Sequence, residues 1–323
     1  MKKLLALVMI LMLATVGFSA FAEGETLTIA GLVHCENQWA DMLMAGMAAA
    51  CEEFGIDFVY SNYNQDAVRE VELINTYVTQ GVAGIIASPS QSSIGAYREA
   101  FEAGIPVAFV NAAIDNNDFS VTHVLYSNYD LGMAAAKCAV DFVRDNLDGK
   151  PVWHALYYKR GEDVENRINA FSDAFREAFG EEYAEPVSNS ATTEESVAMQ
   201  QVTDALTANP DINVLAISNE NQYYGARAAI QSMGLEGKVF CFAVDCSESM
   251  CENMLDEEDP ILQGDGAQNS YAMGYEGCKA LCDHIVNGTE YEPGVSQYME
   301  VPQLSKQNLD AVQEFYDTLL SFR

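Results

Sequence analysis

Short apolar runs alternate along the chain with segments in which apolar residues recur every three or four positions. The first pattern predicts buried strands and the second predicts amphipathic helices. In the first part of the chain, the expected strands are 27–33, 58–60, 82–87 and 107–110, and the expected helices are about 39–54, 66–80 and 94–103. This alternation is typical of βα units in a parallel sheet.

A second series of the same kind begins near residue 127. Its expected helices are 130–144, 163–179, 194–208, 222–233 and about 249–255, and its expected strands are 152–158, 214–217, 239–244 and 261–267. We therefore predict an α/β fold of two similar Rossmann-like lobes with parallel sheets. Because no Pro/Gly/Ser-rich linker separates the two series, we expect several crossing segments to join the lobes. The predicted N-terminal lobe is 23–126 plus about 269–297, and the predicted C-terminal lobe is 127–268 plus about 298–323.

The first 22 residues have the pattern of a secretory signal peptide. Two lysines precede an apolar run at 4–15, and Ala20-Phe21-Ala22 supplies small residues at a cleavage site. The apolar run is shorter than the roughly 18 residues that a membrane span usually needs. We therefore predict export to the periplasm or to the extracellular face of the cell envelope.

The charge of the chain excludes one class of partner. Lys and Arg number 16 against 48 Asp and Glu, which gives a formal net charge of -32. Such a surface repels phosphate backbones and anionic membranes, so we expect no nucleic-acid partner. We attribute the acidic excess to solubility.

The eight cysteines follow the predicted signal peptide, and an even number in an exported protein invites a disulfide interpretation. Several lie among alanines on helical patterns, where thiols behave as small buried hydrophobes. We predict free core thiols, with Cys246 and Cys251 as the first pair to check for a bridge. No C-x-x-C motif occurs and the four histidines are scattered, so no metal site and no cofactor are predicted.

The residues that follow the expected strands are polar or aromatic, and in open parallel sheets ligands bind beyond the carboxyl ends of the strands. The candidate binding residues of the first series are His34, Asn37, Gln38, Trp39, Ser88 and Asn111. Those of the second series are Tyr158, Arg167, Asn219, Asp245 and Gln268. Glu36 and Glu220 are further acidic residues at strand ends.

Eight segments occur in an informative order: TIAGLVHCENQW, IIASPSQSS, GIPVAFVNA, SNYDLGMAAA, ENRINAF, LAISNENQYYGA, FAVDCSES and DGAQNSYAMGYEG. Through them the chain resembles, over nearly all of residues 26–300, the periplasmic sugar-binding proteins of the ribose and galactose type, which are relatives of the lactose-repressor ligand-binding core. The resemblance implies a sugar clamp between two lobes. Trp39 would be its stacking aromatic, and its polar ligand contacts would be Arg167, Asn219, Asp245 and Gln268.

The chain also departs from the pattern of that family. Asn111-Ala112 stands where ribose binders usually have an Asp-Arg pair, and Ser88 stands where they have Asn. Losing one acidic and one basic group opens space, so we expect a ligand that is larger than ribose or functionalised differently. His34 and Glu36 would read an additional polar group.

Three of the candidate residues also have purely structural interpretations. Trp39 lies on the apolar stripe of its helix and would serve the core. Asp245 would cap the helix near 249–255, and Arg167 would pair with Asp163 on the helix surface.

The favoured function is an extracytoplasmic, monomeric solute-binding protein that delivers a sugar or sugar-like ligand to an ABC transporter permease. A sensory module of the same fold that presents its ligand to a membrane receptor is an open alternative, as is a nucleoside or another small polar ligand. We predict no enzyme, because no nucleophile with an adjacent base, no phosphate-binding glycine loop and no metal-ligand cluster is recognisable in the sequence.

Overall fold

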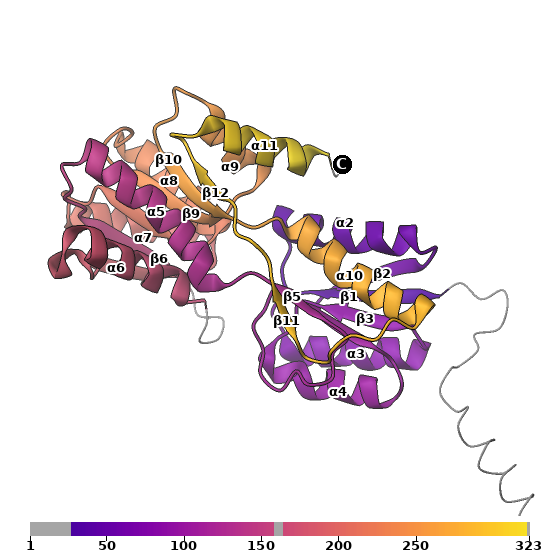
Figure 1. Ribbon diagram of the computed structural model, residues 1–323. Coiled ribbons are helices and arrows are strands. Elements are labelled where there is room, and N and C mark those ends of the chain that lie inside the picture. Colours follow the sequence, from indigo (N-terminus) through magenta and orange to yellow (C-terminus); the bar gives the residue numbers. More distant parts are fainter. Residues whose placement is uncertain (1–26, 158–163, 322–323) are drawn as a thin grey trace, which may run out of the picture.

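Two lobes lie side by side in the computed structural model, which describes residues 27–157 and 164–321 (Figure 1). Each lobe is a six-stranded sheet with helices on both faces. This arrangement confirms the predicted fold class of two similar α/β lobes.

The first sheet has the strand order β11-β5-β4-β3-β1-β2, and all its pairs are parallel. Its strands are β1 (Thr28–Val33), β2 (Asp57–Asn62), β3 (Gly84–Ala87), β4 (Val107–Val110), β5 (His123–Leu125) and β11 (Ser296–Tyr298). The central strands β3 and β4 are buried along their whole length because helices cover both faces. This burial explains why these segments are continuous apolar runs in the sequence.

Helices α2 (Gln38–Glu53) and α10 (Ser270–Asn287) cover one face of the first sheet, and α3 (Ala67–Gln80) and α4 (Ile94–Glu102) cover the other (Figure 1). A 3-10 turn, η1 (Gln91–Ser93), precedes α4. The helices α2 and α10 pack directly against each other although more than 200 residues separate them in sequence. The first lobe is therefore completed by chain that returns from the second.

The second sheet has the strand order β12-β10-β9-β8-β6-β7. Its strands are β6 (Trp153–Tyr157), β7 (Ser188–Ala191), β8 (Val214–Ile217), β9 (Phe240–Asp245), β10 (Leu262–Ala267) and β12 (Gln303–Ser305). Among the described strands of this sheet, β12 alone pairs antiparallel, with β10. The helices of this lobe are α5 (Asn128–Asn146), α6 (Asn166–Phe179), α7 (Glu195–Ala208), α8 (Glu220–Met233), α9 (Glu248–Leu255) and α11 (Leu309–Leu320), with a 3-10 turn η2 (Glu181–Tyr183).

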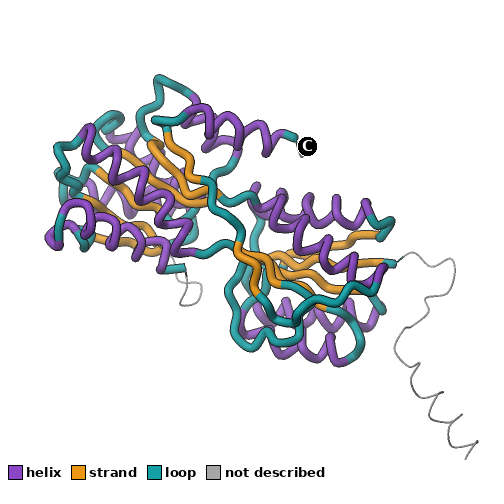
Figure 2. The backbone as a smooth tube through the Cα atoms, viewed as in Figure 1, coloured by secondary structure: helices purple, strands orange, loops and turns teal. Residues whose placement is uncertain are grey.

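In the described part of the chain, the backbone crosses between the lobes three times, from β5 to α5, from β10 to α10 and from β11 to β12 (Figure 2). Because these crossings are short, the two lobes stay close together, and the carboxyl ends of the strands of both sheets lie next to the gap between the lobes. This arrangement positions the candidate site.

The predicted elements do not include the strands β5, β7, β11 and β12 or the helix α10. The strands β7, β11 and β12 lie at sheet edges, and their sequences SNSA, SQY and QLS contain almost no apolar side chains. A short edge strand is stabilised by backbone pairing and buries little apolar surface, so no apolar run marks it. The amphipathic helix α11 was likewise not predicted, although it buries Val312, Phe315 and Leu319.

All eight cysteines lie within the described ranges and are free thiols. Seven of them are buried and Cys35 is partly exposed. The sulfurs of Cys246 and Cys251 are 3.4 Å apart, which is a thiol contact rather than a bond.

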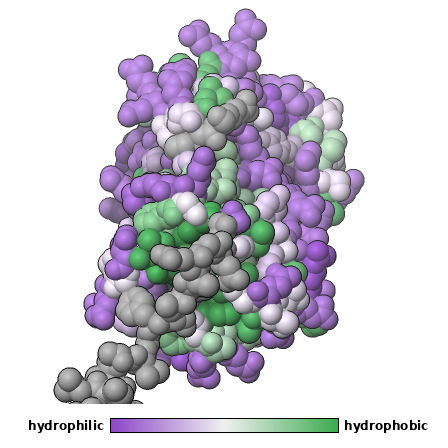
Figure 3. Space-filling model, turned by 90° about the vertical axis from the view of Figure 1, so that its right-hand side faces the viewer, coloured by the Kyte–Doolittle hydropathy of each residue, from purple (hydrophilic) through white to green (hydrophobic). Residues whose placement is uncertain are grey.

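The surface seen from the side of the first lobe is mainly hydrophilic, with hydrophobic residues gathered near its middle (Figure 3). Within residues 27–157 and 164–321, no helix has the length and apolarity that crossing a membrane requires. The predicted signal peptide, residues 1–22, lies outside the described residues.

Candidate ligand-binding cleft

A cleft of about 80 Å³ lies where the carboxyl ends of the two sets of strands meet. The first lobe lines it with His34, Cys35, Asn37, Trp39, Gln65 and Asn111. The second lobe lines it with Arg167, Thr193, Asn219, Glu220, Asn221, Asp245 and Gln268. Residues that are far apart in sequence therefore form one polar site, and most of the predicted binding residues lie in it.

Arg167 is the central cation of the cleft and is only 5% exposed. Its Nε donates to Asn128 Oδ1 at 2.7 Å, and its Nη1 donates to the Ser218 carbonyl at 2.7 Å and to Asp245 Oδ1 at 3.1 Å. These bonds hold the guanidinium plane between α5 and the ends of β8 and β9. The alternative of a solvated helix residue is therefore wrong for Arg167, and Asp163 lies outside the described residues.

The position of Arg167 depends on the close packing of α5 against α6. A Cβ atom at Gly132 would lie 2.0 Å from the carbonyl oxygen of Arg167. Real Cβ atoms do not approach so closely, so only glycine lets the first turn of α6 come this near to α5. The segment SNYDLGMAAA contains Gly132, which allows the close approach of the two helices, and the segment ENRINAF contains Arg167, which that approach positions.

Asp245 ends β9 with φ at +112° and pairs with Arg167 on the same wall of the cleft. Its Oδ2 accepts a hydrogen bond from the backbone N–H of Glu220 at 3.2 Å, at the start of α8. Asp245 therefore joins β9, α6 and α8. It does not cap the next helix, because the N-cap of α9 is Ser247, so the capping alternative is wrong.

The acidic groups of the second lobe are close enough to affect one another. Burial, followed by the charge of Asp245, raises the pKa of Glu220 to about 7. Burial also raises the pKa of Asp245, while the charge of Arg167 opposes that rise. A ligand that donates hydrogen bonds to these carboxylates would offset part of the lost hydration.

Two asparagines at helix starts line opposite walls of the cleft. Asn37 Oδ1 accepts from the Ala40 N–H at 3.0 Å and begins α2. Asn219 Oδ1 accepts from the Gln222 N–H at 3.0 Å and begins α8. Because each cap uses the carbonyl oxygen, the group that each residue can offer to a ligand is its amide N–H2.

Trp39 contributes both to the core and to the cleft. It is 9% exposed, packs in the first-lobe core and lines the cleft. Its indole Nε1 donates to Gln268 Oε1 at 2.8 Å, and its ring lies 5.5 Å from that of His34. The core interpretation and the binding interpretation of Trp39 are therefore compatible.

Ser88 lies behind the cleft wall and is fully buried. Its Oγ is 3.0 Å from His34 Nδ1 and accepts from Asn111 Nδ2 at 3.1 Å. Ser88 therefore orients His34 and Asn111 and is not among the lining residues. Asn111 has φ at +70°, a left-handed conformation that asparagine tolerates better than most residues.

Besides Ser88, two predicted residues are not among those that line the cleft. Gln38 lines a small neighbouring hollow together with Trp39 and Met42. Tyr158 lies outside the described residues.

Several lining residues were absent from the predicted set. Gln65 follows β2 and Thr193 follows β7, while Glu220 and Asn221 follow β8 next to the predicted Asn219. Glu220 was noted as an acidic residue at a strand end but not placed in the predicted set, and applying the same strand-end rule to β2 and to the residue after Glu220 would have added Gln65 and Asn221. The sequence did not indicate Thr193, because the strand before it, β7, has no apolar run by which it could be predicted.

The periplasmic binding protein domain model matches residues 32–290, which is most of the chain and includes strands from both sheets. The chain belongs to the periplasmic binding protein family. The family assignment agrees with the two-lobe fold and with a site between the lobes.

Two relatives are similar in sequence. The D-apiose import binding protein of Actinobacillus succinogenes is 25% identical over 242 residues, covering 72% of this chain and 74% of that protein. The fructose import binding protein of Bifidobacterium longum is 26% identical over 238 residues, covering 68% and 70%.

Two solved structures share the fold. An ABC transporter solute-binding protein from Bacillus halodurans, solved with bound myo-inositol, superposes with a TM-score of 0.78 at 16% identity, covering 92% of this chain and 99% of that one. A galactofuranose-binding protein gives a TM-score of 0.77 at 20% identity, covering 91% and 99%.

Proposed function

We propose that this periplasmic binding protein captures a sugar or a sugar-like polyol between its lobes and delivers it to the permease of an ABC transporter. The observation that carries the proposal is the joint lining of one cleft by an indole from the first lobe and a buried Arg167–Asp245 pair from the second. The names of the two import proteins and the inositol-bound structure support the same ligand class. On this proposal the protein acts outside the cytoplasm and binds its ligand without converting it.

The chemistry of the lining suits a polyhydroxylated ligand. Carboxylate, guanidinium and amide groups each meet hydroxyls as acceptors or donors, and the indole face covers the C–H surface of a sugar ring. Hydrogen bonds to charged groups contribute about 1.5–3 kcal/mol each. Several of them together with stacking reach the roughly 8 kcal/mol of a micromolar complex after the entropy of association is subtracted.

Ligand contacts from both walls would favour a closed arrangement of the lobes. Trp39 and Asn111 stand on one wall, and Arg167 and Asp245 on the other. A ligand that contacts both walls stabilises closure by the difference between its affinities for the closed and open states. We propose that the permease recognises this closed form.

The test is thermal unfolding of the protein against pentoses, hexoses, inositols, nucleosides and amino acids. A ligand at about 100 times its dissociation constant adds roughly 2.7 kcal/mol to the free energy of unfolding. We expect one carbohydrate and its close epimers to raise the midpoint by several degrees. The Asp245→Asn variant should bind that carbohydrate at least about tenfold more weakly, because it loses the charged acceptor.

The matched control is Asp118→Asn, an exposed partner of Arg98 outside the cleft, which should bind as the parent protein does. A midpoint shift with nucleosides or amino acids alone would overturn the proposed ligand class. Equal affinity for the ligand in the parent and in Asp245→Asn would show that Asp245 does not contribute to ligand binding.

A further inference from the structure

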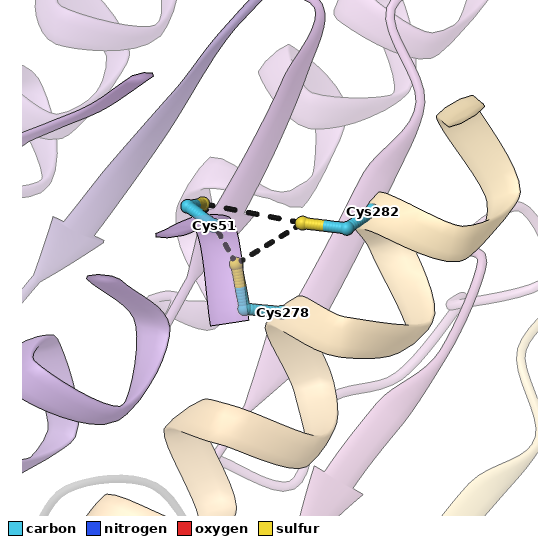
Figure 4. Close-up of side chains that lie close together, drawn as sticks. All are labelled: Cys51, Cys278 and Cys282. Atoms are coloured by element: carbon cyan, nitrogen blue, oxygen red, sulfur yellow. Dashed lines mark hydrogen bonds between the residues drawn. The ribbon is translucent and has the colours of Figure 1, made fainter. Parts of the chain in front are cut away.

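Three buried cysteines meet between the two helices that cover one face of the first sheet. Cys51 lies near the end of α2, and Cys278 and Cys282 lie one turn apart on α10. All three are close to fully buried, and their sulfurs point toward one another (Figure 4). The sulfur of Cys51 is 3.4 Å from that of Cys278 and 4.0 Å from that of Cys282, and the remaining distance is also 4.0 Å.

The helix packing explains this convergence. Residues four apart on a helix share a face, which brings Cys278 and Cys282 together. The helices approach closely, since a Cβ atom at Gly274 would lie 2.2 Å from the carbonyl oxygen of Leu43. The sulfurs are thus held by two long helices of the scaffold, which is a more rigid arrangement than a loop would provide.

The triangle of sulfurs has the size of a metal-binding site. A point in the plane of the three sulfurs and equidistant from them lies about 2.2 Å from each one. A zinc–thiolate bond is about 2.3 Å long. One metal ion could therefore contact all three sulfurs with shifts of only tenths of an ångström. A disulfide would need two sulfurs at about 2.05 Å and would leave the third without a role.

The number and kind of ligands select the ion. In the described part of the chain, no fourth His, Cys, Asp or Glu joins this group. Structural zinc sites are almost always four-coordinate, whereas hard cations prefer oxygen ligands. Thiolates alone suit a soft ion, and a set of three suits Cu(I), which carries no requirement for a fourth ligand.

We propose that Cys51, Cys278 and Cys282 form a three-thiolate site for one Cu(I) ion. This site lies within the first lobe, outside the set of residues that line the ligand cleft. Binding moves the protons of the coordinating thiols to solvent and changes no oxidation state, so no oxidant or reductant is consumed. The copper site and the sugar-binding proposal are therefore independent of each other.

The test is an anaerobic titration of the reduced protein with Cu(I) in competition with a chromogenic Cu(I) chelator. We expect each protein molecule to keep one Cu(I) ion from binding to the chelator. X-ray absorption of the copper-loaded parent protein should give three sulfur ligands and no nitrogen or oxygen ligand. This second measurement needs no substitution, so it stands even where a cysteine variant folds poorly.

The variant Cys282→Ser should lower the affinity for Cu(I) by about a hundredfold or more, because it removes one of the three thiolates. The matched control is Cys246→Ser, which breaks the other close thiol pair and should keep the full equivalent. Three outcomes would overturn the proposal: copper lost from Cys246→Ser and kept by Cys282→Ser, a coordination number of two, or isolation of the exported protein with Cys51 disulfide-bonded to Cys278.

Discussion

The two walls of the cleft are built from different chemistry. The first lobe presents rings, amides and a thiol: His34, Cys35, Asn37, Trp39, Gln65 and Asn111. The second lobe presents the charged groups Arg167, Glu220 and Asp245 beside amides and Thr193. The first wall can therefore be buried at small electrostatic cost, whereas the second depends on charge pairing. Stability, pH dependence and affinity should be concentrated in the second lobe.

The largest effect should come from Arg167→Gln. This substitution leaves Asp245 buried without its cation, and breaking a buried pair typically costs about 3–5 kcal/mol. We expect a loss of that order in the free energy of unfolding, measured by urea denaturation, together with loss of ligand binding. The matched control is Arg98→Gln in the first lobe, whose pair with Asp118 is exposed and should contribute less than about 1 kcal/mol. Equal losses in the two variants would contradict the contrast between the walls.

The sequence predicts the Arg167–Asp245 pair of the second wall, because both residues stand near the ends of apolar runs or periodic helices that are recognisable in the sequence. Asp245 directly ends an apolar run, and Arg167 stands in the first turn of a periodic helix. Asp245 follows from the rule that parallel sheets bind ligands at their carboxyl ends, whereas the ligand role of Arg167, on the helix after β6, is what the family resemblance implies. The order of the two lobes and their α/β class follow from the same periodicity.

Other features depend on tertiary packing and leave no local trace. Ser88 follows a strand, as the rule requires, yet its burial makes it a support for His34 and Asn111. The meeting of Cys51 with Cys278 depends on α10 returning to the first lobe after 227 residues. No spacing within one segment encodes either arrangement.

The second wall should also set the pH dependence of stability, through Glu220. Its pKa rises from 4.5 to about 7 on folding, chiefly by burial. A raised carboxyl pKa means that the folded state holds its proton more tightly, so the contribution of Glu220 to the free energy of unfolding is most favourable below about pH 4.5 and falls as the pH rises through about 7. We expect Glu220→Gln to be more stable than the parent at pH 8, by up to about 3 kcal/mol, and to lose this advantage near pH 4.5.

The measurement is urea denaturation of parent and variant at several pH values between 4.5 and 8. Glu236→Gln is the matched control, because Glu236 is exposed and keeps its hydration when the chain folds. Its stability difference from the parent should stay nearly constant across this range. If the difference in free energy of unfolding between Glu220→Gln and the parent also stays constant with pH, burial of the Glu220 carboxyl does not lower the stability of the protein.

The smallest expected effect concerns the backbone of the first wall, at Asn111. Both Asn111→Gly and Asn111→Ala remove the hydrogen bond to Ser88, but only alanine places a Cβ atom on a backbone with φ at +70°. The left-handed conformation costs a residue with a Cβ about 1 kcal/mol. The glycine variant should therefore be more stable than the alanine variant by roughly that amount.

The reverse order is expected at Asn146, the exposed last residue of α5, where glycine is the poorer helix former. Urea denaturation of the four variants compares the two positions directly. If alanine equals glycine at Asn111, the turn after β4 relaxes at no cost, and the geometry of the first wall is set by the bond between Asn111 and Ser88. If the expected order holds, the backbone itself fixes Asn111 at the cleft, and the first wall is positioned by conformation where the second is positioned by charge.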